Sequence, residues 1–436
     1  EQVVGPLATD TDAVDAGLGS LLHRYLTAFS NSTSPAPARS PRAGAVRTPV
    51  TSRPGEGCRV DELLRGLLAG QRLLGDTEVD DAVSLVEHVA GINSQAARAL
   101  HLGLAARGLL DPLPVCDAAL DGHRLVRANL TRGTLRTVSA ADYRAWRPAL
   151  QPVLERVTRG FLGRRLAEMP LDAVLGDARA LLGQEPLDRA DLGRALAARF
   201  PDHAGDGAGK DLAFAARMLL PLVQEPAAGC WEPQRRPRYL LAEQVVGPLA
   251  TDTDAVDAGL GSLLHRYLTA FGPATLADFR AWSGVSADEA KRALALLPDR
   301  EELAERSIDG TSYLSLPPDG ACESAGGPPD VLLLPPFDDV LFGHADRGRV
   351  ATRDQLKRLV PPAVEMPGIV LVQGRAAGRW RHRPAKRAAD QPSLEVHLFP
   401  EAGAPEPALT AAVESLAGLL AADGRSPQVV VDVWPG

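Results

Sequence analysis

The stretch "ATLADFRAWSGVSADEAKRALALL", residues 274–297, decides the fold, because it has the features of a helix-turn-helix. Ser286 and Glu289 form a predicted capping box at the start of the second helix, and Gly284 falls in the turn before it. The next stretch, "ERSIDGTSYLSL", predicts a hairpin with Asp309-Gly310 at its tip. Helices followed by a hairpin are the parts of a winged helix.

The same order of elements is predicted twice more upstream. Apolar stripes from residue 60 onward indicate three helices, with Thr77 and Asp80 as a capping box, and "LDGHRLVRANLTRGTLRTV" then predicts a hairpin. Farther along, "LDAVLGDARALLG" and "LDRADLGRALAARF" precede a second hairpin region, "LVQEPAAGCWEPQRRPRYLLA". We therefore expect three tandem winged-helix units, at residues 58–150, 151–242 and 243–325.

Residues 326–436 differ in composition from the preceding units, and their strand-forming residues predict a β-rich C-terminal domain. The stretches "DVLLLPPFDDVLFG", "GIVLVQGRAAGRWRHR" and "SLEVHLF" are rich in strand-forming residues, and Gln373-Gly374 marks a turn. A last helix is expected over 406–422, after which "QVVVDVW" closes the sheet. The predicted fold class is α+β: three tandem winged-helix units followed by a small β-barrel-like region.

Residues 1–29 recur without a change at 243–271. The second copy continues into the helix-turn-helix, whereas the first continues into a stretch rich in Ser, Pro and Arg that predicts disorder. We expect residues 1–57 to have no folded role of their own; the alternative is a basic tether that adds weak affinity for phosphates.

The composition predicts a soluble, cytoplasmic protein without a membrane span or a metal. No stretch approaches the roughly 20 apolar residues that a membrane span needs. The four cysteines are scattered singly, and the nine histidines show no metal-ligand spacing. The formal charge of −8 argues at first against nucleic acid, yet only four of the 47 basic residues are lysines, and arginine suits bidentate phosphate contacts.

The predicted recognition helices offer few residues that read bases. In the third unit they offer Lys291 and Arg292, so recognition of phosphates and of DNA shape is the better expectation. The alternative is that these helices only pack against each other.

The strongest basic run is "GRAAGRWRHRPAKR", residues 374–387, and contains no acidic residue. It either grips a phosphate backbone or places Trp380 in a core and its arginines in water.

The stretch "GINSQAAR", residues 91–98, places two carboxamides between two apolar helical patterns. One interpretation is an N-cap, in which Asn93 or Ser94 caps a helix that begins near Gln95. This explains Asn93 well and Gln95 poorly, because Gln is not a favoured capping residue.

From about residue 59 to the C-terminus, the chain resembles the winged-helix DNA glycosylases of the AlkZ/YcaQ type. The resemblance rests on "QRLLGDTEVDDAVSLVEHVAGINSQAARALHLGLAARG", "LVRANLTRGTLRTVSAADY", "LLHRYLTAFGPATLADFRAWSG", "LLLPPFDDVLFGHADR" and "IVLVQGRAAGRW". The family's catalytic signature is Gln-x-Gln with an aliphatic middle residue, and YcaQ-like members end it in Asp. Here Asn93, Ser94 and Gln95 match it: Gln95 is retained, Asn93 is one methylene shorter, and Ser94 replaces the aliphatic residue.

The resemblance implies a monofunctional glycosylase that excises bulky or cross-linking N7-alkylated purines from duplex DNA. It would act in base excision repair and in self-resistance to DNA-alkylating natural products, as a monomer and without a cofactor. Asn93 and Gln95 are the expected catalytic residues. The arginines expected to contact DNA are Arg98, Arg132, Arg136, Arg375, Arg379, Arg381 and Arg383.

A cationic N7-alkylguanine leaves without protonation, so the enzyme needs only to stabilise a cationic sugar and to position a water molecule. We expect Gln95 to orient the water and Asn93 to assist, with a shallow pH dependence. A sharp titration at about pH 5–6 would instead implicate a carboxylate, with Asp338 and Asp339 the first to test. The competing hypotheses are a non-enzymatic DNA-binding protein, such as a regulator or lesion sensor, and a protein-interaction scaffold.

Overall fold

The computed structural model describes most of the chain from residue 56 onward. The described residues are 56–75, 78–203, 207–226, 236–316, 326–360, 366–385, 390–421 and 425–434. The prediction for residues 1–57, including the first copy of the repeat, therefore lies almost wholly outside the described residues. No described helix is both long enough and apolar enough to span a membrane.

The first repeated unit combines helices with a three-stranded sheet. Its elements are α2 (Glu56–Gly70), α3 (Ala82–His88), β1 (Ile92–Asn93), α4 (Ala99–Ala105), α5 (Pro112–Asp121), β2 (Leu125–Asn129), the 3-10 turn η1 (Thr131–Gly133) and β3 (Leu135–Ser139). The strand order is β1-β3-β2, with β2 and β3 as the hairpin. One short strand thus precedes the last two helices and pairs with the hairpin, which is the order expected of a winged helix.

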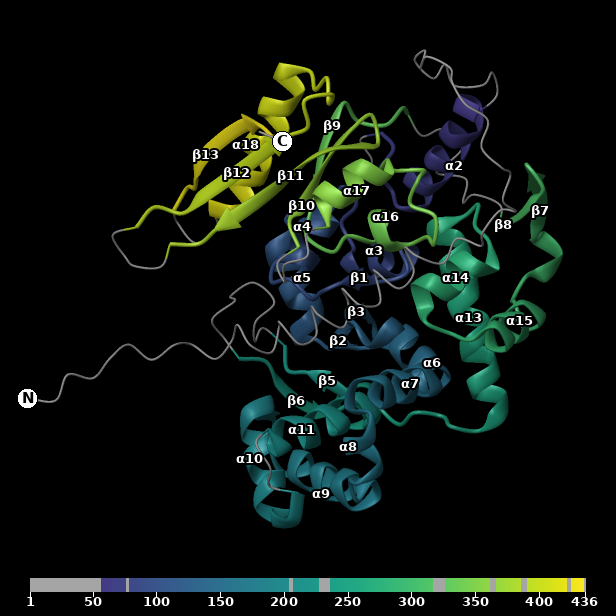
Figure 1. Ribbon diagram of the computed structural model, residues 1–436, viewed down its shortest axis with the longest axis vertical. Helices are drawn as coiled ribbons and strands as arrows, with labels where there is room; N and C mark the ends of the chain where they lie inside the picture. Colours follow the sequence, from purple (N-terminus) through teal and green to yellow (C-terminus); the bar gives the residue numbers. More distant parts are fainter. Residues whose placement is uncertain are drawn as a thin grey trace, which may run out of the picture.

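The second unit repeats this order. Its elements are α6 (Ala140–Ala149), α7 (Gln151–Leu162), α8 (Arg164–Ala167), α9 (Leu171–Gln184), β4 (Leu187–Asp188), α10 (Arg189–Arg199), η2 (Pro201–His203), α11 (Ala208–Leu219), β5 (Leu222–Gln224) and β6 (Arg238–Leu241). The strand order β4-β6-β5 matches that of the first unit. In Figure 1 this unit forms the lower part of the molecule.

The third unit contains the helix-turn-helix. Its elements are α12 (Glu243–Val246), α13 (Thr253–Phe271), α14 (Leu276–Ser283), α15 (Ala287–Ala295), η3 (Arg300–Glu302), β7 (Ala304–Ile308) and β8 (Thr311–Ser315). The capping box of Ser286 and Glu289 is present, and Gly284 ends α14 at φ 85°. Asp309 and Gly310, both at positive φ, form the predicted hairpin turn. A single bridge from Ala274 to β8 takes the place of the short third strand.

The C-terminal part is an open sheet rather than the expected barrel. Its elements are β9 (Val331–Leu334), α16 (Asp339–Phe342), α17 (Arg353–Leu359), β10 (Gly368–Val372), β11 (Arg375–Arg383), β12 (Ser393–Leu398), α18 (Glu406–Leu420) and β13 (Gln428–Val433). The strand order is β13-β12-β11-β10-β9, and only β13 runs parallel to its neighbour. The barrel prediction assumed that the last strand closes the sheet, but β13 instead extends it at one edge (Figure 1).

The core of the third unit also holds α16 in place. Tyr267 of α13 lies between two aromatic side chains, with ring centroids 5.1 Å from Phe271 and 5.2 Å from Trp282. Its hydroxyl donates a 2.8 Å hydrogen bond to the carbonyl oxygen of Gly343, directly after α16. Truncation of a buried aromatic residue such as Trp282 costs about 3–5 kcal/mol. A rigid support therefore lies behind the segment that carries Asp338 and Asp339.

Candidate active site

A left-handed turn carries Asn93 into the site. Ala90 and Gly91 have φ values of 59° and 80°, which an alanine rarely adopts. A Cβ atom on Gly91 would lie 2.7 Å from Cγ1 of Val138, so only glycine fits without movement of β3. β1 then pairs with β3, with Asn93 opposite Arg136.

The N-cap interpretation of this segment is wrong. Asn93 belongs to a strand, and α4 begins at Ala99 rather than near Gln95. Arg98 occupies the N-cap position of α4 at φ 69°, with no capping hydrogen bond from its side chain. The start of α3 also differs, because Asp81 is its N-cap; Thr77 lies outside the described residues.

The two carboxamides are hydrogen-bonded to each other. The backbone N–H of Gln95 donates to Oδ1 of Asn93 at 3.2 Å, and Nδ2 of Asn93 lies 3.5 Å from Oε1 of Gln95. Asn93 is 4% exposed, whereas Gln95 is half-buried, so a nucleotide approaching the pair meets Gln95 first. An amide has two donors and two acceptor lone pairs, so Asn93 keeps capacity for a further partner.

Ser94 fixes the backbone between the carboxamides. Its hydroxyl lies 2.7 Å from Oγ1 of Thr137, and its N–H donates to the carbonyl oxygen of Leu135. Arg127 of β2 donates to the carbonyl oxygen of Ser94 at 2.5 Å. A small hydroxyl side chain is therefore accommodated within the hydrogen bonds of the sheet at this position.

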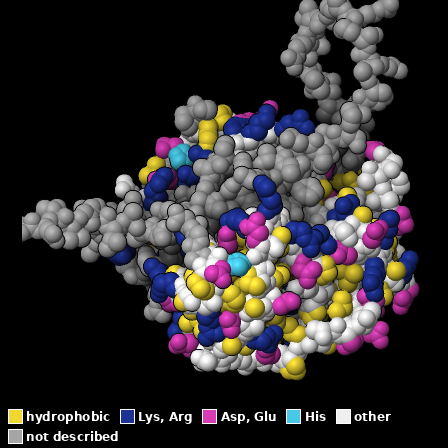
Figure 2. Space-filling view, turned by 60° about the horizontal axis from the view of Figure 1, so that its bottom comes forward, with side chains coloured by type: hydrophobic (Ala, Val, Ile, Leu, Met, Phe, Trp, Pro, Cys, Tyr) yellow, Lys and Arg dark blue, Asp and Glu magenta, His cyan; other side chains and the backbone are white. Residues whose placement is uncertain are grey.

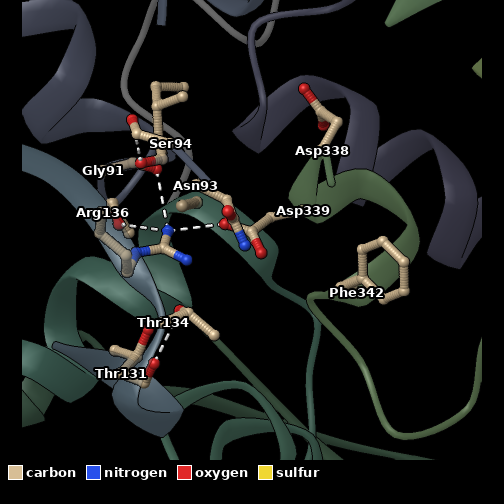
Figure 3. Close-up of polar contacts among 12 residues, drawn as sticks. Gly91, Asn93, Ser94, Thr131, Thr134, Arg136, Asp338, Asp339 and Phe342 are labelled. Atoms are coloured by element: carbon tan, nitrogen blue, oxygen red, sulfur yellow. Dashed lines mark hydrogen bonds and ion pairs between the residues drawn. The ribbon is translucent and has the colours of Figure 1, made fainter. Parts of the chain in front are cut away.

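Arg136 lies inside the protein, not on a surface that DNA can reach. Its side chain is 0% exposed, and Nη2 donates to the carbonyl oxygens of Ala90 and Gly91 at 3.2 and 3.0 Å. The same atom lies 2.6 Å from Oδ2 of Asp339 (Figure 3). Arg136 thus joins the left-handed turn to α16, and the structure gives it a supporting position in place of the expected DNA contact.

Arg132 is also largely occupied by protein contacts. Its side chain is 9% exposed, with Nη1 close to the carbonyl oxygens of Ala281 and Phe342 and Nη2 3.7 Å from Oδ1 of Asp339. Burial lowers the pKa of Arg132 to about 10, against an opposing effect of Asp339. The guanidinium therefore stays charged at neutral pH but is not presented at an exposed hairpin tip.

The two adjacent aspartates differ in their partners. Both are 5% exposed. The oxygens of Asp338 accept hydrogen bonds of 2.9 and 3.0 Å from Arg107, and one also accepts from the N–H of Val340. Both oxygens of Asp339 lack a hydrogen-bonding partner within the described part of the chain, because its arginine contacts do not have hydrogen-bond geometry.

A small cavity of about 10 Å³ lies between the carboxamide motif and α16. Asn93, Asp338 and Asp339 line it, together with Gln71 and Arg107. The volume is about that of one water molecule. Residues from the first unit and from the C-terminal part therefore meet at one polar point, although some 240 residues of sequence separate Asn93 from Asp338.

The arginines of the basic run lie on β11. Trp380 is 2% exposed and donates through Nε1 to the carbonyl oxygen of Leu334, so it belongs to the core, as one interpretation of the run predicted. Arg375 and Arg383 are exposed, and Arg379 and Arg381 are half-buried. Arg379 stacks on Trp434 at 3.4 Å, and its pKa is lowered, first by burial and then by Arg381. The remaining basic residues of the run, Lys386 and Arg387, lie outside the described residues.

The basic residues of α15, the helix expected to approach DNA, lie close to acidic side chains. Lys291 lies 3.7 Å from Asp288, and Arg292 lies 2.7 Å from Asp257 of α13.

No group of three His, Cys, Asp or Glu side chains able to hold a metal ion occurs among the residues whose placement is described. The sequence-based reasoning missed Arg107, Arg127 and Gln71, which reach the site only through long-range contacts.

Comparison with known proteins agrees with this architecture. A family model described as "DNA glycosylase AlkZ-like" matches residues 86–421, well over half of the chain. The solved structure of Streptomyces sahachiroi DNA glycosylase AlkZ is 22% identical to this chain, with a TM-score of 0.64. The match covers 85% of this chain and 98% of that one, and at this identity it shows a shared fold. A search of curated proteins gave no match.

Proposed function

The chain belongs to the AlkZ-like family of DNA glycosylases, and from this premise we propose that it hydrolyses the N-glycosidic bond of bulky or cross-linking N7-alkylated purines in duplex DNA. The observation that carries the proposal is the hydrogen-bonded pair of Asn93 and Gln95, with Gln95 at the accessible end. Repair of alkylation damage, and self-resistance to natural products that cause it, are the roles that fit this chemistry.

The chemistry relies on a leaving group that already carries positive charge. As the bond from C1′ to the purine breaks, the electron pair neutralises the base, and the sugar takes on oxocarbenium character. Amide oxygens favour this cation, because they are fixed dipoles that need no titration. In our proposal Gln95 orients the attacking water, and Asn93 holds Gln95 through their two contacts.

We infer that the three repeated units are winged-helix modules and that DNA contacts phosphate-binding arginines outside the buried site. Arg375, Arg379, Arg381 and Arg383 follow one another along β11 and retain exposed surface, which supports this strand as the main contact. Arg98, half-buried beside the carboxamide motif, is the remaining candidate. Phosphate contacts of this kind position DNA without reading its sequence.

The face in Figure 2 gives less support for DNA binding. On its described residues, basic side chains are interspersed with acidic and apolar ones and form no continuous basic band. Such mixing is typical of an ordinary solvent-facing surface. We therefore place the bound duplex on the side of β11 and the carboxamide motif.

An excision assay tests the proposal. The protein is incubated with a duplex that contains one N7-methylguanine, and abasic sites are converted to strand breaks by heat and alkali. We expect breaks from the wild-type protein and a loss of about 10²–10³-fold in the single-turnover rate for Gln95→Ala, the range for removing one preorganised polar group. The same assay with a duplex carrying a bulkier or cross-linking N7 adduct tests the substrate class.

The alternative is a DNA-binding protein without catalysis, such as a lesion sensor. The replacement of the family's first Gln by Asn93 and of its aliphatic residue by Ser94 favours it. Binding of the alkylated duplex without strand breaks, at an enzyme concentration above the Kd, would establish this alternative and overturn the proposed function.

A further inference from the structure

Asp339 is a buried carboxylate with unused hydrogen-bonding capacity beside the carboxamide motif. It is 5% exposed, and its oxygens accept no hydrogen bond from any residue that the structure describes. Buried polar atoms of native proteins are usually satisfied, and an exception in a polar cavity indicates a ligand or water partner. Both oxygens of Asp338, one residue earlier, accept hydrogen bonds from Arg107, and one also accepts from the N–H of Val340, so less acceptor capacity remains there.

Asp339 and Asn93 line the same cavity, and its volume of about 10 Å³ suits one water molecule. Among the other polar walls, Gln71 donates to the carbonyl oxygen of Ala270 and accepts from Arg107, whereas Nε of Arg107 has no hydrogen-bonding partner among the described residues. Arg107 can offer a water molecule only a donor, while both oxygens of Asp339 can accept from it and Asn93 retains capacity for a second contact.

We propose that Asp339 is a catalytic residue of the glycosylase: it shares the attacking water with the carboxamide pair, of which Asn93 lines the same cavity and Gln95 orients the water from the accessible side, and it accepts the proton of that water. This inference rests on the proposed function. The water oxygen forms a bond to C1′ as the bond from C1′ to the alkylated purine breaks. The electron pair of that broken bond leaves with the purine, which becomes neutral, and one proton of the water passes to Asp339.

Charged groups from several elements surround Asp339. Arg136 of β3 and Arg132 of η1 face its two oxygens, the Tyr267 hydroxyl of α13 interacts with it electrostatically, and Arg347 acts on Arg132. Arg107 and Asp338 neutralise each other at 2.9 Å.

The test compares single-turnover excision of N7-methylguanine by the wild type and by Asp339→Asn between pH 4 and 9. General base catalysis contributes typically about 10²–10⁴-fold, so we expect a loss in that range for Asp339→Asn at neutral pH. The wild-type rate should fall on the acid side, and this acid limb should be absent from the variant. Because Asp339→Asn also removes the partner of buried Arg136, both proteins are assayed at a temperature at which circular dichroism shows the variant folded. Binding of an uncleavable abasic-analogue duplex should then change less than about threefold.

Two further variants separate the possible outcomes. Asp354→Asn, on the exposed side of α17, is the matched control and should keep the wild-type rate and pH profile. If Asp339→Asn loses activity but keeps the acid limb, or keeps full activity while Gln95→Ala is inactive, the role of Asp339 is overturned and the glycosylase function stands. A wild-type protein that excises nothing overturns both.

Discussion

Replacement of Asp338 by Asn should strongly destabilise the protein, because it leaves a buried cation without its counter-ion. The side chains of Arg107 and Asp338 are 1% and 2% exposed, and two parallel hydrogen bonds of 2.9 and 3.0 Å join them. In the variant, Arg107 keeps only neutral acceptors, which are Gln71 and Gly103 at 2.8 and 2.9 Å and the amide oxygen of the introduced asparagine. Removal of one partner of a buried ion pair costs about 3–5 kcal/mol of unfolding free energy.

Urea denaturation followed by tryptophan fluorescence measures this loss. Asp354→Asn provides the matched control, since it breaks a pair with Lys357 in which the side chains are 83% and 71% exposed. Such a surface pair contributes about 0–1 kcal/mol. Replacing both Arg107 and Asp338 by apolar residues should recover part of the loss, because no unpaired charge remains. A value for Asp338→Asn within about 1 kcal/mol of the wild type would refute this account of the ion pair.

Three other predictions follow from the structure. Burial, with a smaller effect of Glu87, raises the pKa of Asp142 to about 6, against the opposing charge of Arg266 and from an ordinary value of 3.8. The folded state therefore binds the proton more tightly than the unfolded state, and the free energy of unfolding rises as pH falls from about 7 towards 4. In thermal melts, Asp142→Asn should be more stable than the wild type at pH 7.5, by at most about 3 kcal/mol, and equally stable near pH 4. Changing both Arg379 and Arg381 to Ala should weaken binding to all DNA sequences alike and lower the salt slope by up to about 2 in fluorescence anisotropy, whereas a loss confined to one sequence would contradict phosphate recognition. Gly91→Ala should displace the carboxamide turn through its contact with β3, so that excision falls while DNA binding is kept; unchanged excision would show that the turn tolerates a side chain.

The features predicted most accurately from the sequence are those determined by residues a few positions apart. The capping box of Ser286 and Glu289, the turn at Gly284, and the hairpin turns at Asp309-Gly310 and Gln373-Gly374 all depend on residues a few positions apart. Each uses a local hydrogen bond or a positive φ that Gly or Asp adopts readily. These features were correct because tertiary packing does not compete with them.

The features that failed depend on contacts between distant parts of the chain. Arg136 was expected to contact DNA, yet its side chain is buried, where it contacts Asp339 and donates to the carbonyl oxygens of Ala90 and Gly91. The apolar spacing after Gln95 suggested an earlier helix, but pairing of β1 with β3 holds the segment extended and delays the start of α4. No local pattern in the sequence reports such long-range partners.

Asn93, which stands where the family's motif has Gln, affects the space between the carboxamide motif and α16. A shorter amide at position 93 leaves space between β1 and α16 for a cavity of about 10 Å³, and a carboxylate with free acceptor capacity lines the same cavity. Lengthening the amide should fill that space. Asn93→Gln, which restores the family's first residue, is therefore expected to displace the water that Asp339 activates and to lower the excision rate, and adding Asp339→Asn should then cost little more. If Asp339→Asn costs as much in the Asn93→Gln background as in the wild type in single-turnover excision, the shorter amide and the carboxylate do not act together.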